Sequence, residues 1–145
     1  MTQEERNLLI QDLCGRLPYG VIVKKEYTFV FTNGTISKSK KIEKLDLEDI
    51  EYLISGDDCV DVLKPYLRSL SSMTENEKEE LKILCDKDLS EFAGHLMKGH
   101  GLSRDGLYMF DKLRQLDWLN KHHFDYRGLI DKRLALEAKE GMYND

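Results

Sequence analysis

Long hydrophobic runs are missing from this 145-residue sequence. Its apolar stretches are short, as at residues 21–23 and 29–31, whereas a membrane-spanning helix needs about 20 apolar residues in succession. The polar and acidic residues from Met1 to Arg6 do not follow the order of a secretion signal, in which a basic segment precedes an apolar one. We therefore expect a cytoplasmic protein with no membrane partner.

Cysteine is also scarce. Cys14, Cys59 and Cys85 are odd in number and widely spaced, and no Cys-x-x-Cys pair occurs, so neither a disulfide framework nor a zinc site is predicted. Cys14 and Cys85 fall at apolar positions of predicted helices. This placement predicts free, buried thiols that react slowly in the native protein.

The motifs of common enzyme classes are absent as well. The sequence has no Gly-x-Ser-x-Gly elbow, no Gly-x-x-x-x-Gly-Lys-Ser/Thr loop and no His-x-x-x-His pair. His122 and His123 are poor joint metal ligands, because adjacent side chains diverge. The sequence therefore predicts no catalytic residue, no cofactor and no metal ligand. A small metal-dependent enzyme is the third of three functional interpretations.

Charge is abundant and unevenly placed. The net charge of −5 is mild and argues against a protein that grips nucleic acid with its whole surface. Six lysines nevertheless stand within residues 24–44, while residues 46–61 hold seven acids and no base. Two solvated faces explain this pattern, and the alternative is a weak nucleic-acid surface on a lysine-rich hairpin of residues 24–44. That surface would consist of Lys38, Lys40, Lys41 and Lys44.

Local signals predict a helix and then a hairpin at the start of the chain. Thr2 and Glu5 have capping-box spacing and open a helix that stops near Gly15. Three short strands follow, at residues 21–23, 27–32 and 35–37. Between the last two, Asn33-Gly34 predicts a two-residue hairpin turn. Alternation of Tyr27, Phe29 and Phe31 along the second strand is typical of a core face.

The rest of the chain is predicted to be mostly helical. The expected helices span residues 46–56, 74–98, 107–120 and 125–130. Asp46 and Asp125 are the expected caps of the first and last, and Thr74 with Glu77 repeats the capping-box spacing. Residues 64–73 are predicted to be an irregular connector. The result is a single α+β domain over residues 1–145, with a small antiparallel sheet of two to three strands against four to five helices.

Residues 116–130 concentrate aromatic, imidazole and guanidinium side chains. Trp118 shares a helix side with Leu107 and is expected to be buried, in a helix that is apolar on two sides and therefore central. Beyond the helix end, side chains of the types that anchor interfaces could meet a partner. The predicted partner-binding residues are His122, His123, Tyr126 and Arg127.

Three sequence blocks carry a resemblance to a known group of proteins. They are Arg16-Leu-Pro-Tyr-Gly-Val21, residues Lys64 to Thr74, and Asp117 to Ile130 running on to Leu136-Glu137 and Gly141-Met-Tyr143. They resemble a family of short proteins of unassigned function from gut anaerobic bacteria, their phages and other mobile elements. The resemblance implies a phage or mobile-element setting and brings no activity, cofactor or site residue.

We therefore predict a non-enzymatic protein-interaction module, an accessory protein of phage or mobile-element type. Another protein is the expected partner, and a homodimer is a further option. A nucleic-acid-associated protein that uses the lysine-rich hairpin is the alternative.

Overall fold

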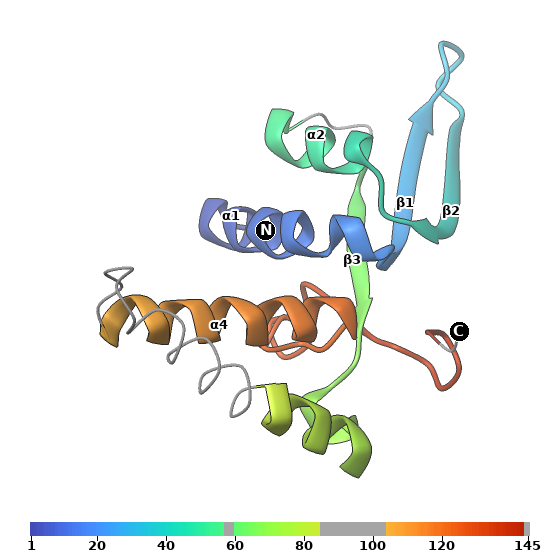
Figure 1. The fold of residues 1–145 in the computed structure, drawn as a ribbon. Coiled ribbons are helices and arrows are strands. Elements are labelled where there is room, and N and C mark those ends of the chain that lie inside the picture. Colours follow the sequence, from blue (N-terminus) through green and yellow to red (C-terminus); the bar gives the residue numbers. More distant parts are fainter. Residues whose placement is uncertain (57–59, 85–103, 144–145) are drawn as a thin grey trace.

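The computed structural model describes residues 1–56, 60–84 and 104–143 (Figure 1). In chain order the elements are α1 (Gln3–Arg16), the short 3-10 helix η1 (Leu17–Tyr19), β1 (Ile22–Val30), β2 (Ile36–Lys44), α2 (Leu47–Ser55), β3 (Val62–Leu67), η2 (Leu70–Ser72), a helix over residues 75–84, α4 (Arg104–Lys121) and β4 (Leu136–Glu137). The α+β class is confirmed. No described helix is both long and apolar enough to cross a membrane.

The sheet has four strands in the order β2-β1-β3-β4, rather than the two or three predicted. It is mixed, because β1 is antiparallel to both β2 and β3 whereas β4 runs parallel to β3. The prediction of an irregular connector over residues 64–73 was wrong, since β3 occupies its first part. Pairing with β1, which local sequence does not reveal, makes this segment a strand.

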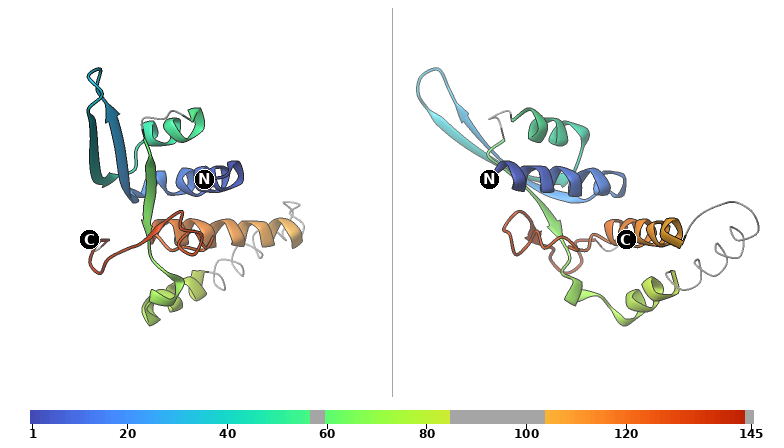
Figure 2. Two further views of the ribbon diagram at one scale, coloured as in Figure 1. Left: turned by 180° about the vertical axis from the view of Figure 1, so that it is seen from behind. Right: turned by 90° about the vertical axis from the view of Figure 1, so that its left-hand side faces the viewer.

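The hairpin is longer than predicted, and only the half near its base has a third strand beside it. β1 pairs with β2 along its whole length, from Ile22 to Val30, but with β3 only from Val23 to Glu26. Beyond Glu26 the two strands therefore continue without a third. Figures 1 and 2 show them projecting past the helices.

The predicted hairpin is confirmed, but its turn has three residues instead of two. The Phe31 N–H donates to the Thr35 carbonyl at 2.8 Å, and the Gly34 N–H donates to the Phe31 carbonyl at 2.9 Å. Gly34 has φ of 84°, in the left-handed region that glycine adopts without strain. This is the turn-plus-bulge arrangement of three-residue hairpin loops.

The predicted helix starts of α1 and α2 are confirmed. Thr2 and Glu5 form a capping box, and Asp46 forms another with Asp49 at the start of α2. α1 runs to Arg16, just past the predicted stop. Cys14 is a free thiol but is exposed, so its predicted burial was wrong. The buried face of α1 passes through Leu9 and Leu13, and the neighbour of Leu13 turns away from it. Cys59 and Cys85 lie outside the described residues.

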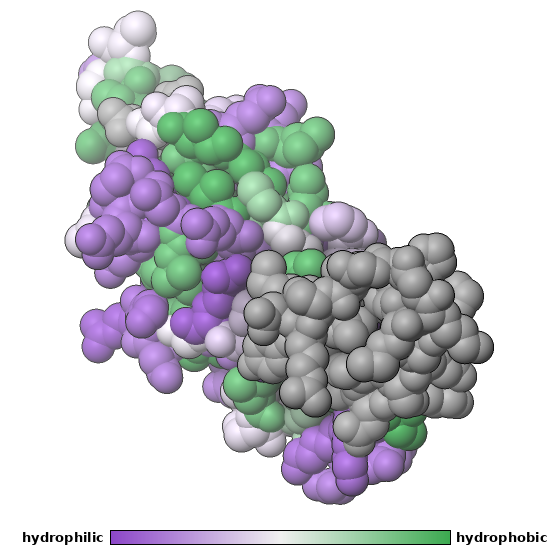
Figure 3. All heavy atoms as spheres, turned by 60° about the vertical axis from the view of Figure 1, so that its left-hand side comes forward, coloured by the Kyte–Doolittle hydropathy of each residue, from purple (hydrophilic) through white to green (hydrophobic). Residues whose placement is uncertain are grey.

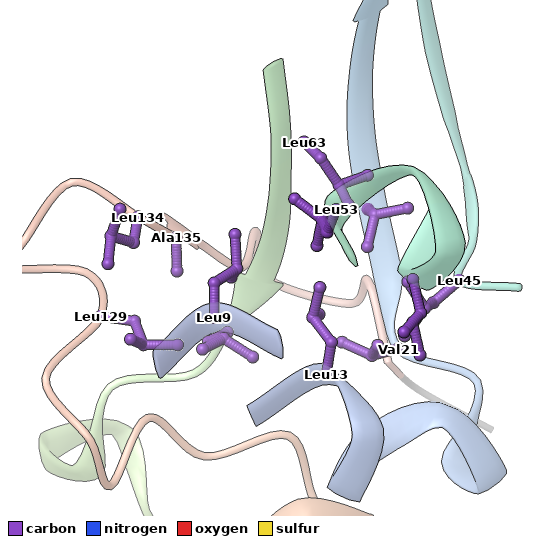
Figure 4. Packing of buried hydrophobic residues seen from close by; sticks show 12 residues of the cluster. Leu9, Leu13, Val21, Leu45, Leu53, Leu63, Leu129, Leu134 and Ala135 are labelled. Atoms are coloured by element: carbon purple, nitrogen blue, oxygen red, sulfur yellow. The ribbon is translucent and has the colours of Figure 1, made fainter. Parts of the chain in front are cut away.

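The hydrophobic core lies between α1, α2, the sheet and the turns after residue 128. In Figure 4, Leu9 of α1 points to the side chains of Leu129 and Ala135, while Leu13 lies beside Val21 and Leu45. α1 therefore joins the C-terminal turns to the hairpin base and α2. Among the described residues fourteen apolar side chains are buried, and their removal from water favours folding.

Three predictions for the C-terminal half need correction. Residues 125–130 form turns rather than a helix, because the Asp125 carboxylate accepts N–H groups of both Leu129 and Ile130 at 2.9 Å. The predicted helix over 107–120 is confirmed by α4. The predicted burial of Trp118 was wrong, because its side chain is only half-buried. The predicted packing of this helix on two sides was also wrong, because Leu113 is exposed. The Thr74–Glu77 capping box is confirmed. The part of the predicted helix beyond residue 84 lies outside the described residues.

A buried ion pair joins α1 to the chain after α4. Asp12 and Arg16 both have fully buried side chains, with the Arg16 Nε 2.7 Å from the Asp12 Oδ2. The Arg16 Nη2 donates to the Asp12 Oδ1 at 3.0 Å and to the Phe124 carbonyl at 2.7 Å. A single guanidinium group thus connects α1 to the backbone at Phe124.

Replacing Asp12→Ala should lower the free energy of unfolding by about 3–5 kcal/mol, because the Arg16 charge would stay buried without its carboxylate. Unfolding in urea measures the loss. The matched control is Glu75→Ala, which removes the acid of an exposed pair, Glu75 with Lys78, and should change stability by less than about 0.5 kcal/mol. Equal losses in the two variants would contradict the structural role of the buried pair.

Candidate functional site

The structure uses the predicted partner-binding segment, residues 122–127, mainly for internal contacts. The buried His123 ring stacks on Tyr143 with 3.8 Å between centroids, and its backbone is left-handed, with φ of 63°. The His122 ring lies 4.1 Å from that of Trp118, and burial lowers the pKa of His122. These two rings therefore contact other residues of the same chain at the C-terminal end of α4.

Tyr126 and Arg127 also face inward in part. The Tyr126 hydroxyl donates to the Asn120 Oδ1 at 2.9 Å, and the Arg127 Nε lies 3.4 Å from the Asp12 Oδ1. The Tyr126 ring lies between two guanidinium groups, 5.3 Å from that of Arg16 and 5.2 Å from that of Arg127. The structure thus gathers Tyr126 and Arg127 around the buried ion pair of α1. No observation tests their predicted role in binding a partner.

A second polar cluster surrounds Arg68, at the end of β3. Its guanidinium donates two hydrogen bonds to Glu77, at 2.8 and 2.9 Å, and lies 4.2 Å from the centre of the Phe124 ring. Phe124 in turn stacks on Trp118. The hydrogen bonds from Arg68 lower the pKa of Glu77 to about 2. Glu77 also accepts from the Thr74 hydroxyl, so this pair fixes the start of the helix over residues 75–84.

Arg68 and Glu77 line a surface cleft of ≈ 500 Å³, with η2 on one side and residues 137–143 on the other. Its walls carry hydroxyl groups of Ser69, Ser72 and Thr74. The cation and the anion at its base already bind each other, and the Ser72 hydroxyl donates to the Ser69 carbonyl at 2.7 Å. The cleft is thus of a size for a small ligand, and its Arg68, Glu77 and Ser72 side chains already bond to other groups of the protein.

The predicted nucleic-acid lysines are split between two faces of the hairpin. Directly opposed residues on antiparallel strands share a face. Lys25, opposite Lys41, faces α2, whereas Lys24 and its partners on the neighbouring strands face away from all helices. This outer face carries Lys24, Lys38, Lys40, Lys44 and Lys64. Lys41 lies instead on the inner side, 5.9 Å from the centre of the Tyr27 ring.

Part of the charge on the outer face is already balanced. The Glu26 carboxylate lies 2.7 Å from the Lys24 Nζ and 3.8 Å from the Lys40 Nζ. Lysines 38 and 44 have no such carboxylate within the described residues. The outer face is therefore positive, but less so than its lysine content indicates.

A buried cation anchors the base of the hairpin. The Lys25 side chain is 3% exposed, and its Nζ lies 2.6 Å from the Asp49 Oδ1 and 2.9 Å from the Glu43 Oε1. Burial by itself would lower the pKa of Lys25, but hydrogen bonds to the two carboxylates outweigh it and raise the pKa. A charged Lys25 thus ties β1 to β2 and to the first turn of α2. The projecting half starts from a rigid base.

The projecting half exposes apolar side chains on both faces. Phe29 is 51% exposed, Val30 70%, Phe31 53% and Ile36 63%. In Figure 3 the hairpin lies in the distance at the upper left, where green hydrophobic atoms stand among pale ones. The prediction that Phe29 and Phe31 belong to a core face was wrong, because no described helix covers their side chains. The sequence pattern found the strand face but not the missing cover.

The described residues contain no group of three or more histidine, cysteine, aspartate or glutamate side chains arranged to hold a metal ion. Comparison with known protein families, with curated proteins and with solved structures found no match to this chain. Two features are candidates for a functional site, the cleft beside Arg68 and the projecting hairpin.

The charge state of Glu77 provides a test of the Arg68 cluster. A pKa held near 2, below the ordinary 4.5, means that the pair adds its full stability above pH 4.5 and loses it as the pH falls through about 2. Glu77→Gln keeps a capping side chain but removes the charge. The difference in unfolding free energy between wild type and Glu77→Gln should be constant above about pH 5 and shrink toward pH 2.

The control for that comparison is Glu75→Gln, in the same helix turn. The Glu75 side chain is 89% exposed and pairs only with an exposed lysine. Its variant should track the wild type at every pH. If Glu77→Gln behaved in the same way, Arg68 and Glu77 would not form a charged pair in solution.

Proposed function

We propose that this protein is a non-enzymatic protein-interaction module whose binding element is the projecting half of the β1–β2 hairpin. The observation that carries the proposal is the exposure of Phe29, Val30, Phe31 and Ile36 together on a segment that supports no other part of the fold. Large apolar side chains exposed close together often mark a protein-interaction site. From the resemblance we add a phage or mobile-element setting in the cytoplasm.

Two features of the hairpin support a binding role. Its base is fixed by the buried Lys25 with Asp49 and Glu43, so the binding surface is presented on a rigid element and loses little freedom on binding. Aromatic and branched aliphatic side chains flank its turn, and side chains of these types anchor protein interfaces when they enter a pocket. In the cleft beside Arg68, by contrast, the guanidinium and the Glu77 carboxylate already bond to each other.

Nucleic acid is the second candidate, and the lysines of the outer face favour it. Lys24 and Lys40 already face Glu26, however, and isoleucines stand between the lysines of β2. A phosphate-binding ribbon would gain nothing from Ile36 and Ile42, which are exposed on the same face. The mixture of apolar and basic side chains suits a protein surface better.

Photo-crosslinking tests the proposal in the cell from which the gene comes. A benzophenone amino acid in place of Phe31 or Ile36 should yield a discrete protein adduct that mass spectrometry identifies. The matched control places it at Leu47 or Ile54 of α2, which are each 66% exposed but lie on the body. Absence of a hairpin-specific protein adduct, or an adduct to nucleic acid alone, would refute the proposal.

A gel shift measures the second candidate. We expect no shift of DNA or RNA oligonucleotides near neutral pH. A complex that weakened steeply with added salt would establish phosphate contacts instead, because each neutralised phosphate releases counterions. Charge reversal at the predicted residues should then abolish it. The reversed set is Lys38, Lys40, Lys41 and Lys44.

A further inference from the structure

The outer edge of the sheet is a strand without a neighbour. β2 is the first strand in the order β2-β1-β3-β4, and no described element pairs with its outer side. Eight of its nine residues are exposed. An unpaired edge of this length presents a row of backbone donors and acceptors to any extended chain of suitable sequence.

The hydrogen-bonding pattern shows which backbone groups are available. The Leu45 N–H donates to the Val21 carbonyl and the Phe31 N–H to the Thr35 carbonyl, each at 2.8 Å. Both pairs are odd-numbered in the β1–β2 register, and bonded pairs recur at every second position of an antiparallel ladder. The N–H and C=O groups of the even-numbered residues therefore point outward. These residues are Ile36, Lys38, Lys40, Ile42 and Lys44.

A second copy of the chain is a poor occupant of this edge. β2 carries Lys38, Lys40, Lys41 and Lys44 against a single acid, Glu43. Pairing two copies of β2 would place lysines beside lysines, and like charges on facing strands are destabilising. Lysines on an edge strand are a known protection against self-association. The homodimer expected from the sequence as an option is not favoured at this edge.

Protection alone does not explain the composition of the edge. Ile36 is 63% and Ile42 58% exposed, and on the outer face they flank Lys38 and Lys40. A strand that only repelled its own copies would not need apolar side chains there. An incoming strand with acids opposite the lysines and apolar residues opposite the isoleucines would satisfy both types at once.

We propose that β2 is completed by an extended, acidic segment of a partner protein, which adds as a new edge strand and bonds to the backbone of Lys38, Lys40 and Ile42. This inference rests on the proposed function and specifies its geometry. The backbone pairing supplies affinity, and the side chains of the outer face select acids opposite Lys38 and Lys40 and apolar residues opposite Ile36 and Ile42. The apolar tip at Val30 and Phe31 then lies at the end of the added strand.

Capped synthetic peptides of about nine residues provide the probe, with glutamate at the positions that face Lys38, Lys40 and Lys44, valine at those that face Ile36 and Ile42, and uncharged residues between. The controls are a peptide with lysine in place of glutamate, one N-methylated along one edge, and oligonucleotides. Fluorescence anisotropy should show binding of the acidic peptide alone. Hydrogen exchange should slow at the amides of Lys38, Lys40 and Ile42, which nucleic acid bound through lysine side chains would leave unchanged.

Two substitutions at one position separate the backbone from the side chain. Lys40→Pro removes an outward N–H and leaves the β1 pairing intact, which edge strands tolerate. Lys40→Ala removes the same charge but keeps the N–H. Affinity should fall roughly tenfold further for the proline variant than for the alanine variant. Circular dichroism and the melting temperature confirm that both variants fold.

A charge swap tests the selection of acids. Lys38→Glu with Lys44→Glu should abolish binding of the acidic peptide and create binding of the basic one. Lys132→Glu with Lys139→Glu, two exposed lysines elsewhere, should change neither. Failure of the acidic peptide to bind, binding without slowed exchange at the three amides, or equal affinities of Lys40→Pro and Lys40→Ala would overturn the strand addition.

The experiments distinguish a failure of the proposed function from a failure of the added strand. A protein adduct at Phe31 or Ile36, together with a peptide that leaves the edge amides unprotected, would keep the binding module and exclude the added strand. A concentration-dependent dimer in sedimentation that Lys40→Pro disrupts would show that the occupant is a second copy, and would overturn the acidic partner.

Discussion

The arrangement of the chain depends on the hydrogen bonds that the buried Arg16 guanidinium donates. Its hydrogen bonds reach Asp12, one helix turn earlier, and the carbonyl of Phe124, more than a hundred residues later. A buried charge is tolerated only where its partners are held in place. α1 therefore requires the segment after α4 to be in position, and that segment requires α1. Tyr126 and Arg127 complete the same cluster.

The same segment also reaches the sheet. The Arg68 N–H donates to the His123 carbonyl and the Asp125 N–H to the Arg68 carbonyl, each at 2.8 Å. Residues 123–125 therefore pair alongside the end of β3, in parallel orientation. The Tyr143 hydroxyl accepts from the Ile22 N–H and donates to the Tyr66 carbonyl. All three sequence blocks that carry the family resemblance thus meet in one scaffold. Their unusual residues are explained by contacts within the chain.

The hairpin is physically different from this scaffold. Its base shares the core and the Lys25 ion pairs, whereas its outer half has no third strand and no described helix beside it (Figure 2). Exposed apolar side chains there remain in water and add nothing to the stability of the core. A free sheet edge carrying lysines and isoleucines lies next to them. This separation of a tied scaffold from a free binding element underlies the proposed function.

The sequence by itself determined the short-range features: the helix caps at Thr2, Asp46 and Thr74, the hairpin at Asn33-Gly34 and the α+β class. These depend on contacts between residues a few positions apart, which local patterns record. Only the tertiary structure decided that residues 62–67 are a strand, that Phe29 and Phe31 are uncovered, and that Tyr126 and Arg127 surround a buried ion pair. Each of these depends on which distant segment lies alongside, because strand pairing, burial and charge compensation are set by neighbours in space.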